Sequence, residues 1–172
     1  MKNDVEYLEF MWPMKTFLIT CADMNGNPNI IAVSFCMPVS KEPPLVACAI
    51  GRESFSCQLI QVTKEFIINV PTAELKKQVY YCGYNSGRMV DKFKETKLTP
   101  KPARKVKPPI IDECIAQMEC VLEDIFKTGD KNLFVGKVIE AYADESIVKG
   151  EKKVNYSSGD FPRKIYGTRF LK

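Results

Sequence analysis

The chain has 172 residues, of which 45% are hydrophobic and 27% charged, and its formal net charge is +4. This apolar content is enough for one sizeable core, so we expect a single domain over residues 1–172. The sequence has no basic-then-apolar leader and no apolar run long enough to cross a bilayer, which predicts a soluble, cytoplasmic protein without a membrane partner.

The cysteine and histidine content limits which disulfides, metal sites and catalytic side chains the chain can have. The chain has seven cysteines, an odd number without a CxxC pair, and it has no histidine. A disulfide scaffold, a zinc site and a haem site are therefore disfavoured, and we expect no metal and mostly core thiols. The lack of histidine removes the usual general base and the Ser-His and Cys-His nucleophile pairs. If the protein is an enzyme, we expect a cofactor rather than a catalytic side chain to carry the reaction.

The first half of the chain alternates β-rich runs with turn residues. Strands are predicted over residues 16–22, 29–36, 45–50 and 65–70. Gly26 lies in a predicted hairpin turn over residues 23–27, and Pro38 and Pro71 are expected to follow the ends of strands. The spacing of the first three strands predicts an antiparallel meander.

Helices and two more strands complete the predicted elements. Either Ser54 or Ser56 can cap a short helix, and Thr72 can cap a second one over residues 72–81. Two further strands are predicted over residues 116–124 and 132–143. This set favours a mainly β fold, a compact β-barrel with a few helices. Because residues 45–50 are apolar on both faces, a helix, a ligand or a second subunit must cover one face, which favours a dimer.

A basic, proline-containing segment spans residues 92–107, with seven basic residues and one acidic residue. A nucleic-acid patch is one interpretation, but Phe93 is the only aromatic residue there for base stacking. Pro100 and Pro102 within it, with Pro108 and Pro109 directly after it, favour an extended, solvated surface connection that raises the local positive potential. We therefore expect no nucleic-acid partner.

One short motif has the residue types of an anion-binding site. Asn85, Ser86 and Gly87 form a turn sequence, and Arg88 follows directly. Arg88 and Lys92 are four residues apart, so on one helical turn both would project from the same face. Free N–H groups, a hydroxyl and two cations together form an anion cradle. The alternative interpretation is a polar helix start on a solvated face.

Ten short motifs occur in a characteristic order along the chain. They are Pro13 and residues 25–29, 41–45, 52–54, 64–71, 82–83, 86–88, 91–93, 119–120 and 133–138. Their order resembles the flavin reductase-like family of FMN-binding split barrels, which includes flavoredoxins. The resemblance covers residues 13–143, and it is the order of the motifs rather than any one of them that carries it.

The resemblance implies a Greek-key split barrel that forms a homodimer and binds FMN near the subunit interface. Residues 29–36 would lie along the flavin, the loop and helix start after Gly51 would bind the phosphate, and residues 86–92 would close over the phosphate or the ribityl chain. The implied cofactor-binding residues are Asn29, Val33, Ser34, Phe35, Cys36, Gly51, Arg52, Ser54, Ser56, Ser86, Gly87, Arg88 and Lys92. This assignment agrees with the charge of an FMN phosphate, which binds favourably to helix N-terminal N–H groups, hydroxyls and guanidinium donors. For Cys36, a core thiol without a redox role is the alternative.

The resemblance also implies an activity. FMN would be reduced by NADH or NADPH and would pass electrons to free flavin, ferric iron or a partner enzyme. The alternative is a non-enzymatic, flavoredoxin-type electron carrier whose basic segment docks an acidic protein donor. A cofactor-free, RNA-binding barrel is disfavoured because it leaves both arginine-serine sites unexplained. The chain lacks the histidine that the family often carries near its C-terminus and keeps only Tyr166 and Gly167 there, while Trp12 can cover the flavin or plug the barrel end.

Overall fold

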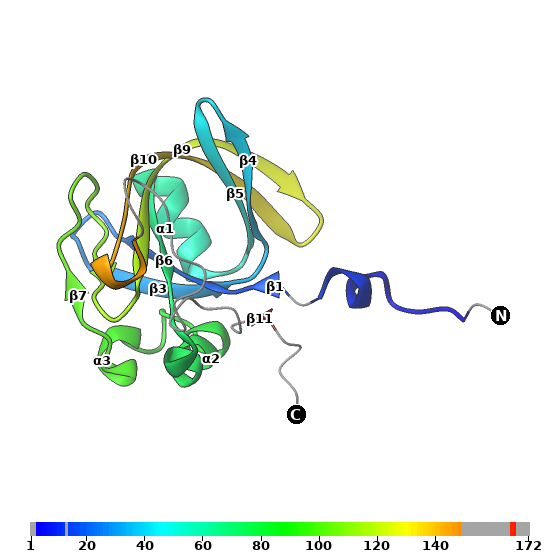
Figure 1. Ribbon diagram of the computed structural model, residues 1–172, viewed down its shortest axis with the longest axis horizontal. Coiled ribbons are helices and arrows are strands. Elements are labelled where there is room, and N and C mark those ends of the chain that lie inside the picture. Colours follow the sequence, from blue (N-terminus) through cyan, green and yellow to red (C-terminus); the bar gives the residue numbers. More distant parts are fainter. Residues whose placement is uncertain (1–2, 13, 149–165, 168–172) are drawn as a thin grey trace.

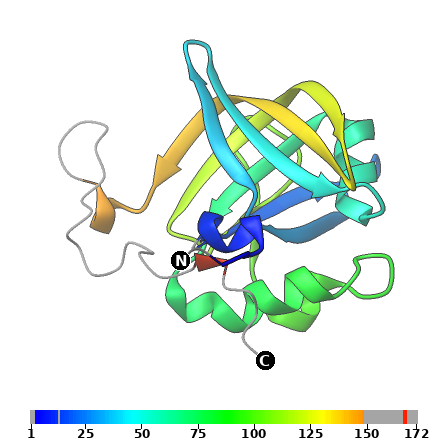
Figure 2. The same ribbon diagram turned by 90° about the vertical axis from the view of Figure 1, so that its right-hand side faces the viewer.

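Seven strands form the main sheet, and every neighbouring pair is antiparallel. A computed structural model describes residues 3–12, 14–148 and 166–167, and the sheet curls around a core (Figure 1, Figure 2). In spatial order the strands are β3 (Pro28–Val33), β2 (Phe17–Ala22), β6 (Glu65–Val70), β9 (Ala116–Thr128), β10 (Lys131–Ala143), β5 (Pro44–Gly51) and β4 (Cys36–Lys41). Because β3 and β4 are unpaired edges, the sheet curls without closing. The predicted mainly β split barrel is confirmed.

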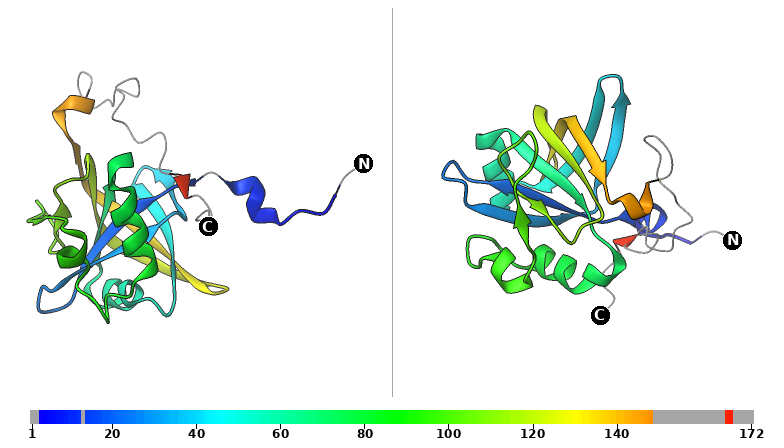
Figure 3. Two further views of the ribbon diagram at one scale, coloured as in Figure 1. Left: turned by 90° about the horizontal axis from the view of Figure 1, so that it is seen from below. Right: turned by 60° about the vertical axis from the view of Figure 1, so that its left-hand side comes forward.

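The helices in the described residues are short. They are η1 (Tyr7–Met11), α1 (Phe55–Thr63), η2 (Ala73–Leu75), α2 (Lys76–Tyr84), α3 (Lys92–Thr96) and η3 (Glu145–Ile147). Two small strand pairs lie outside the main sheet, β1 (Met14–Lys15) with β11 (Tyr166–Gly167) and β7 (Pro100–Lys101) with β8 (Ile110–Ile111). Figure 3 shows α2 and α3 together on one side of the barrel, with η1 projecting from it.

No helix in the described ranges is long and apolar enough to span a membrane. Pro13, the first residue of the family pattern, lies outside the described residues.

The predicted strand over residues 29–36 is two strands in the structure. β3 ends at Val33 and β4 begins at Cys36, and these two strands form opposite edges of the sheet. The predicted three-strand meander is therefore wrong, since β3 pairs with β2 whereas β5 pairs with β4 and β10. Pro38 does not stop the strand, because an edge strand tolerates a residue without an N–H group.

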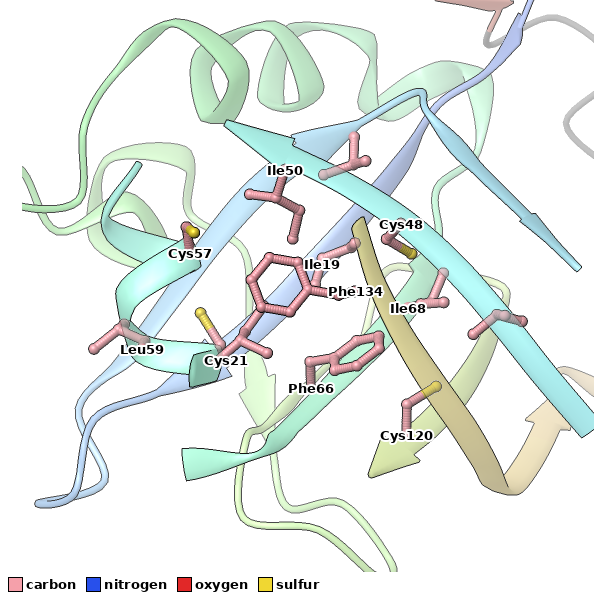
Figure 4. Packing of buried hydrophobic residues seen from close by; sticks show 13 residues of the cluster. Ile19, Cys21, Cys48, Ile50, Cys57, Leu59, Phe66, Ile68, Cys120 and Phe134 are labelled. Atoms are coloured by element: carbon pink, nitrogen blue, oxygen red, sulfur yellow. The ribbon is translucent and has the colours of Figure 1, made fainter. Parts of the chain in front are cut away.

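The barrel interior holds the largest of the three hydrophobic clusters in the described residues. Phe66 from β6 and Phe134 from β10 lie at its centre, and α1 contributes Leu59 and Ile60 (Figure 4). Helix α1 begins where the sequence predicts, because the Ser54 hydroxyl accepts a hydrogen bond from the Cys57 backbone N–H at 3.1 Å. Six of the seven cysteines are buried and all are free thiols, which confirms that most of them are core residues.

A second cluster covers the outer face of the β2–β3 hairpin. Successive residues of a strand point to opposite faces, so Ile19 belongs to the interior cluster while Leu18 packs outward. Helices α2 and α3 meet that outer face with Val79 and Phe93. Helices therefore cover the outer face of β2, so this strand is covered on both sides.

Two predictions for the helical side are wrong. Thr72 precedes η2, but its side chain makes no capping hydrogen bond, and the helix continues to Tyr84. The basic segment is not a solvated linker throughout, because Lys92 and Phe93 are buried in α3. The prolines and lysines favour an extended segment, but Phe93 and Leu98 between them belong to the second cluster.

Replacing Gly136 with alanine is expected to lower the free energy of unfolding by about 1–3 kcal/mol. A Cβ atom at this position of β10 would lie 2.4 Å from Cζ of the buried Phe66 ring. Urea denaturation measures the change, and Gly51→Ala is the matched control because a Cβ there meets no atom within 4 Å. Equal stability of the two variants would contradict the packing of Phe66 against β10.

Candidate functional site

A pocket of about 370 Å³ opens between the start of α1 and the segment that joins α2 to α3. Its lining includes seven of the predicted cofactor residues: Asn29, Ser54, Ser56, Ser86, Gly87, Arg88 and Lys92. Ile31, Glu53, Phe55 and residues 82–85 complete the lining. A second hollow of about 470 Å³ adjoins it and shares Phe55, Gly87 and Arg88. The serine-containing start of α1 and the segment around residues 86–88, about 30 residues apart in the sequence, therefore meet at one site.

The back of the pocket is a close contact between β3, α1 and the loop after α2. Asn29 is 4% exposed, and its Nδ2 atom donates to the Ser56 hydroxyl at 2.7 Å. Gly87 lies directly against Asn29, since a Cβ on this glycine would come within 2.0 Å of Asn29 Oδ1. Only glycine permits this approach, which explains the residue type at position 87.

Arg88 ties the two walls of the pocket together. Its Nη1 atom donates to the Glu53 backbone carbonyl at 2.9 Å, and its guanidinium lies 5.5 Å from the centre of the Phe55 ring. Its own backbone N–H donates to the Ser86 hydroxyl at 3.3 Å. The guanidinium thus fixes the loop beside the N-terminus of α1, where unpaired N–H groups favour an anion.

Lys92 brings a buried positive charge to the pocket. It is 5% exposed, and its Nζ atom donates to the backbone carbonyls of Ile30 at 2.7 Å and Cys82 at 2.8 Å. Burial lowers the pKa of Lys92, although the nearby Cys82 and Cys21 thiols act in the opposite direction. An ammonium group has three N–H donors, so two carbonyl bonds leave one donor for a ligand.

No carboxylate in the described ranges forms an ion pair with Lys92. A buried cation without an acidic partner is costly, and an anion bound in the pocket would reduce that cost. The expectation that Arg88 and Lys92 share a helical face is wrong, because α3 begins at Lys92 and Arg88 lies in the preceding loop. Both nevertheless line the same pocket.

The remaining predicted residues lie outside this pocket. Ser34 Oγ is 2.8 Å from Thr16 Oγ1, and the Lys131 ammonium lies 5.6 Å from the centre of the Phe35 ring. Arg52 is exposed, and its Nε atom donates to the Lys131 carbonyl at 3.4 Å. The others outside the pocket are Val33, Cys36 and Gly51. Contacts of Val33, Ser34, Phe35 and Cys36 with a flavin ring stay predictions, as do contacts of Gly51 and Arg52 with its phosphate. A role for Trp12, which follows η1 and does not line the pocket, also stays a prediction.

Sequence reasoning missed several lining residues. Ile31 could have been found, because it follows Asn29 by two positions and so lies on the same face of β3. The local sequence pattern does not indicate Glu53 and Phe55, because only the turn into α1 brings them to the pocket.

Comparison with known proteins identifies the class. A model of the flavin reductase like domain matches residues 11–163, so the chain belongs to this family. It is 35% identical over 152 residues to an uncharacterised protein of Archaeoglobus fulgidus, covering 88% of this chain and 85% of that one. It is 28% identical over 131 residues to a flavin reductase of Pseudomonas putida, covering 75% of this chain and 72% of that one.

A solved structure agrees with the sequence relatives. The flavoredoxin of Desulfovibrio vulgaris (Miyazaki F) superposes with a TM-score of 0.80 and is 25% identical, covering 87% of this chain and 80% of that chain. The resemblance inferred from the order of short motifs is thereby confirmed.

Proposed function

We propose that the protein is an FMN-binding oxidoreductase that holds the FMN phosphate in the pocket between α1 and α3. The observation that carries this proposal is Lys92, a buried cation without an acidic partner in the described ranges that lines a pocket beside a helix N-terminus. The family and the similarity to a flavoredoxin support a flavin as the anion's source.

The residues present suit the phosphate. Lys92 offers one N–H donor, the start of α1 offers backbone N–H groups, and Ser86 offers a hydroxyl. The isoalloxazine ring would lie along residues 33–36, whereas Gly51, which ends β5, and Arg52 would belong to the loop that leads to the phosphate site. When bound, FMN supplies hydride-acceptor and electron-transfer chemistry, so the protein's own task is to bind and orient it.

We propose NADH or NADPH as the electron donor, and free flavin, ferric iron or a partner protein as the acceptor. The flavin reductase relative supports this activity. The second candidate is an electron carrier that takes electrons from an acidic protein, and the flavoredoxin neighbour favours it. A docking surface would then use exposed members of the basic segment such as Lys94, Lys97 and Lys105, since Lys92 is buried.

We further propose a cytoplasmic homodimer with the flavin near its interface. Met37 and Val39 on the edge strand β4 are 57% and 46% exposed, and Phe126 on β9 is 51% exposed. These side chains would gain from contact with a second copy. The seven free thiols suit a reducing compartment.

An anaerobic absorption spectrum after incubation with FMN tests the activity. If the protein is an NAD(P)H-dependent reductase, a bound-flavin spectrum forms and bleaches promptly when NADH or NADPH is added. A bound flavin that stays oxidised would reject the reductase and leave the electron carrier. Failure to bind FMN, with salt-sensitive binding to RNA instead, would reject both.

Gly87→Ala is expected to weaken FMN binding by roughly tenfold, because the new methyl group displaces Asn29 and breaks its hydrogen bond to Ser56. A fluorescence titration with FMN measures the change. In the Asn29→Ala background, which removes the displaced amide, adding Gly87→Ala should cost much less. Additive effects of the two substitutions would contradict the contact.

A further inference from the structure

Two cysteine sulfurs face each other across the β4–β5 hairpin. Cys36 in β4 and Cys48 in β5 are register partners, and their Sγ atoms are 3.0 Å apart. The Ala49 N–H donates to the Phe35 carbonyl at 2.8 Å, so the neighbouring pair of residues is the hydrogen-bonded one. The Cys36–Cys48 pair is therefore a non-hydrogen-bonded pair, in which side chains of antiparallel strands approach most closely.

The two thiols differ in their surroundings. Cys48 is fully buried, whereas Cys36 is half-buried on the edge strand. The hydrogen bond with Cys36, together with burial, raises the pKa of Cys48. Lys15 is close enough to Cys36 for the two to interact electrostatically, so a positive charge lies near the more accessible sulfur. A reagent from solvent would therefore reach Cys36 first.

No other pair of cysteine sulfurs in the described ranges lies within hydrogen-bonding distance. Cys57 contacts amide groups of Gln61 and Asn132, and Cys21 and Cys120 contact backbone carbonyls. The pairing across β4 and β5 thus distinguishes two of the seven thiols from the rest.

We propose that Cys36 and Cys48 form a reversible dithiol–disulfide pair that exchanges with low-molecular-weight disulfides. The Cys36 thiolate attacks one sulfur of the small disulfide, which forms a mixed disulfide and releases one thiol. The Cys48 thiolate then attacks the Cys36 sulfur, which forms the Cys36–Cys48 bond and releases the second thiol. The two protein thiols are oxidised, the small disulfide is reduced, and the two cysteine protons pass to the released thiols.

Neither sulfur lines the phosphate pocket, but Cys36 belongs to the segment proposed to lie along the flavin ring, so the exchange is measured on the protein without added FMN. The Cys36–Cys48 bond would link the edge strand β4 covalently to β5. An exposed edge strand is otherwise held on one side only, so the bond would restrain fraying there.

Thiol counting under redox control tests the proposal. The 172-residue protein is equilibrated without oxygen in oxidised glutathione, denatured, alkylated and weighed, and it is then reduced with dithiothreitol, alkylated again and weighed again. We expect the count of alkylated thiols to fall from seven to five and to return to seven on reduction. Tandem mass spectrometry should link Cys36 to Cys48 and find the alkyl group on Cys21, which shares a tryptic peptide with Cys36.

Two variants sharpen the test. Cys48→Ala should stop at a glutathionyl group on Cys36, whereas Cys114→Ala, which removes a buried thiol without a sulfur partner, should keep the Cys36–Cys48 bond. A count that stays at seven, a bond between other cysteines, or a lasting glutathionyl group on Cys36 of the unmodified chain would overturn the proposal. The thiol count of the unmodified chain decides even if a variant does not fold.

Discussion

Lys92→Met is expected to weaken FMN binding by about 10- to 100-fold, the loss of one charge-assisted hydrogen bond of about 1.5–3 kcal/mol. Methionine keeps the apolar stem of the side chain but removes the ammonium group that lines the pocket. The Ile30 and Cys82 carbonyls also lose their donor, so the fold should become less stable. Isothermal titration with FMN measures the affinity, and circular dichroism at the same temperature verifies that the variant is folded.

Lys94→Met is the matched control for this change. Lys94 lies two residues further along α3 and is exposed, so its removal lowers the net charge equally without touching the pocket. We expect its FMN affinity to stay close to that of the unmodified protein. If both lysine variants lose the same affinity, a general electrostatic attraction explains the binding and the specific role of Lys92 is refuted.

Glu119→Gln is expected to lower the free energy of unfolding by about 2–4 kcal/mol, because an amide cannot replace a carboxylate that accepts four hydrogen bonds. One carboxylate oxygen accepts from Arg104 N and the Tyr142 hydroxyl, and the other from Lys105 N and Val106 N, at 2.7–3.1 Å. The side chain is fully buried in β9 and holds residues 104–106 against the barrel. Urea denaturation measures the loss, and the exposed Glu123→Gln on the same strand should change stability by less than about 0.5 kcal/mol.

The same carboxylate predicts a pH dependence. Burial alone would raise the pKa of Glu119, but the hydrogen bonds outweigh it and hold the pKa below its ordinary value. A depressed pKa in the folded state stabilises the protein above the unfolded pKa of about 4.3, and this contribution is lost as the pH falls through the folded value. The stability difference between the unmodified chain and Glu119→Gln should therefore shrink in acid. A difference that stays constant from pH 7 to pH 3 would contradict this account.

Much of the fold could be predicted from local signals. Strands with uninterrupted apolar runs, such as β5 and β6, and the serine-capped start of α1 lie where the sequence predicts them. The break between β3 and β4 could not be predicted, because residues 33–36 are β-forming and only the sheet's curvature separates the two strands. The pairing of β5 with β10 joins segments about 85 residues apart, which local pattern does not specify.

Part of the candidate site could also be predicted from local signals in the sequence. Turn and capping chemistry depends on neighbouring residues, so the sequence alone indicates Ser54 and Gly87. The sequence does not indicate the burial of Lys92, because its carbonyl partners lie on β3 and at the end of α2, and a lysine in a basic segment is usually solvated. The contact of Gly87 with Asn29 likewise depends on tertiary packing.

The central claim is that the pocket with Lys92 holds the FMN phosphate. Calorimetric titrations with FMN and with riboflavin test it most directly, since the two ligands differ only in the phosphate. If the pocket with Lys92 holds that phosphate, FMN should bind at least about tenfold more tightly than riboflavin, and the advantage should largely disappear in Lys92→Met. Equal affinities of the unmodified protein for FMN and riboflavin would contradict the assignment of this pocket.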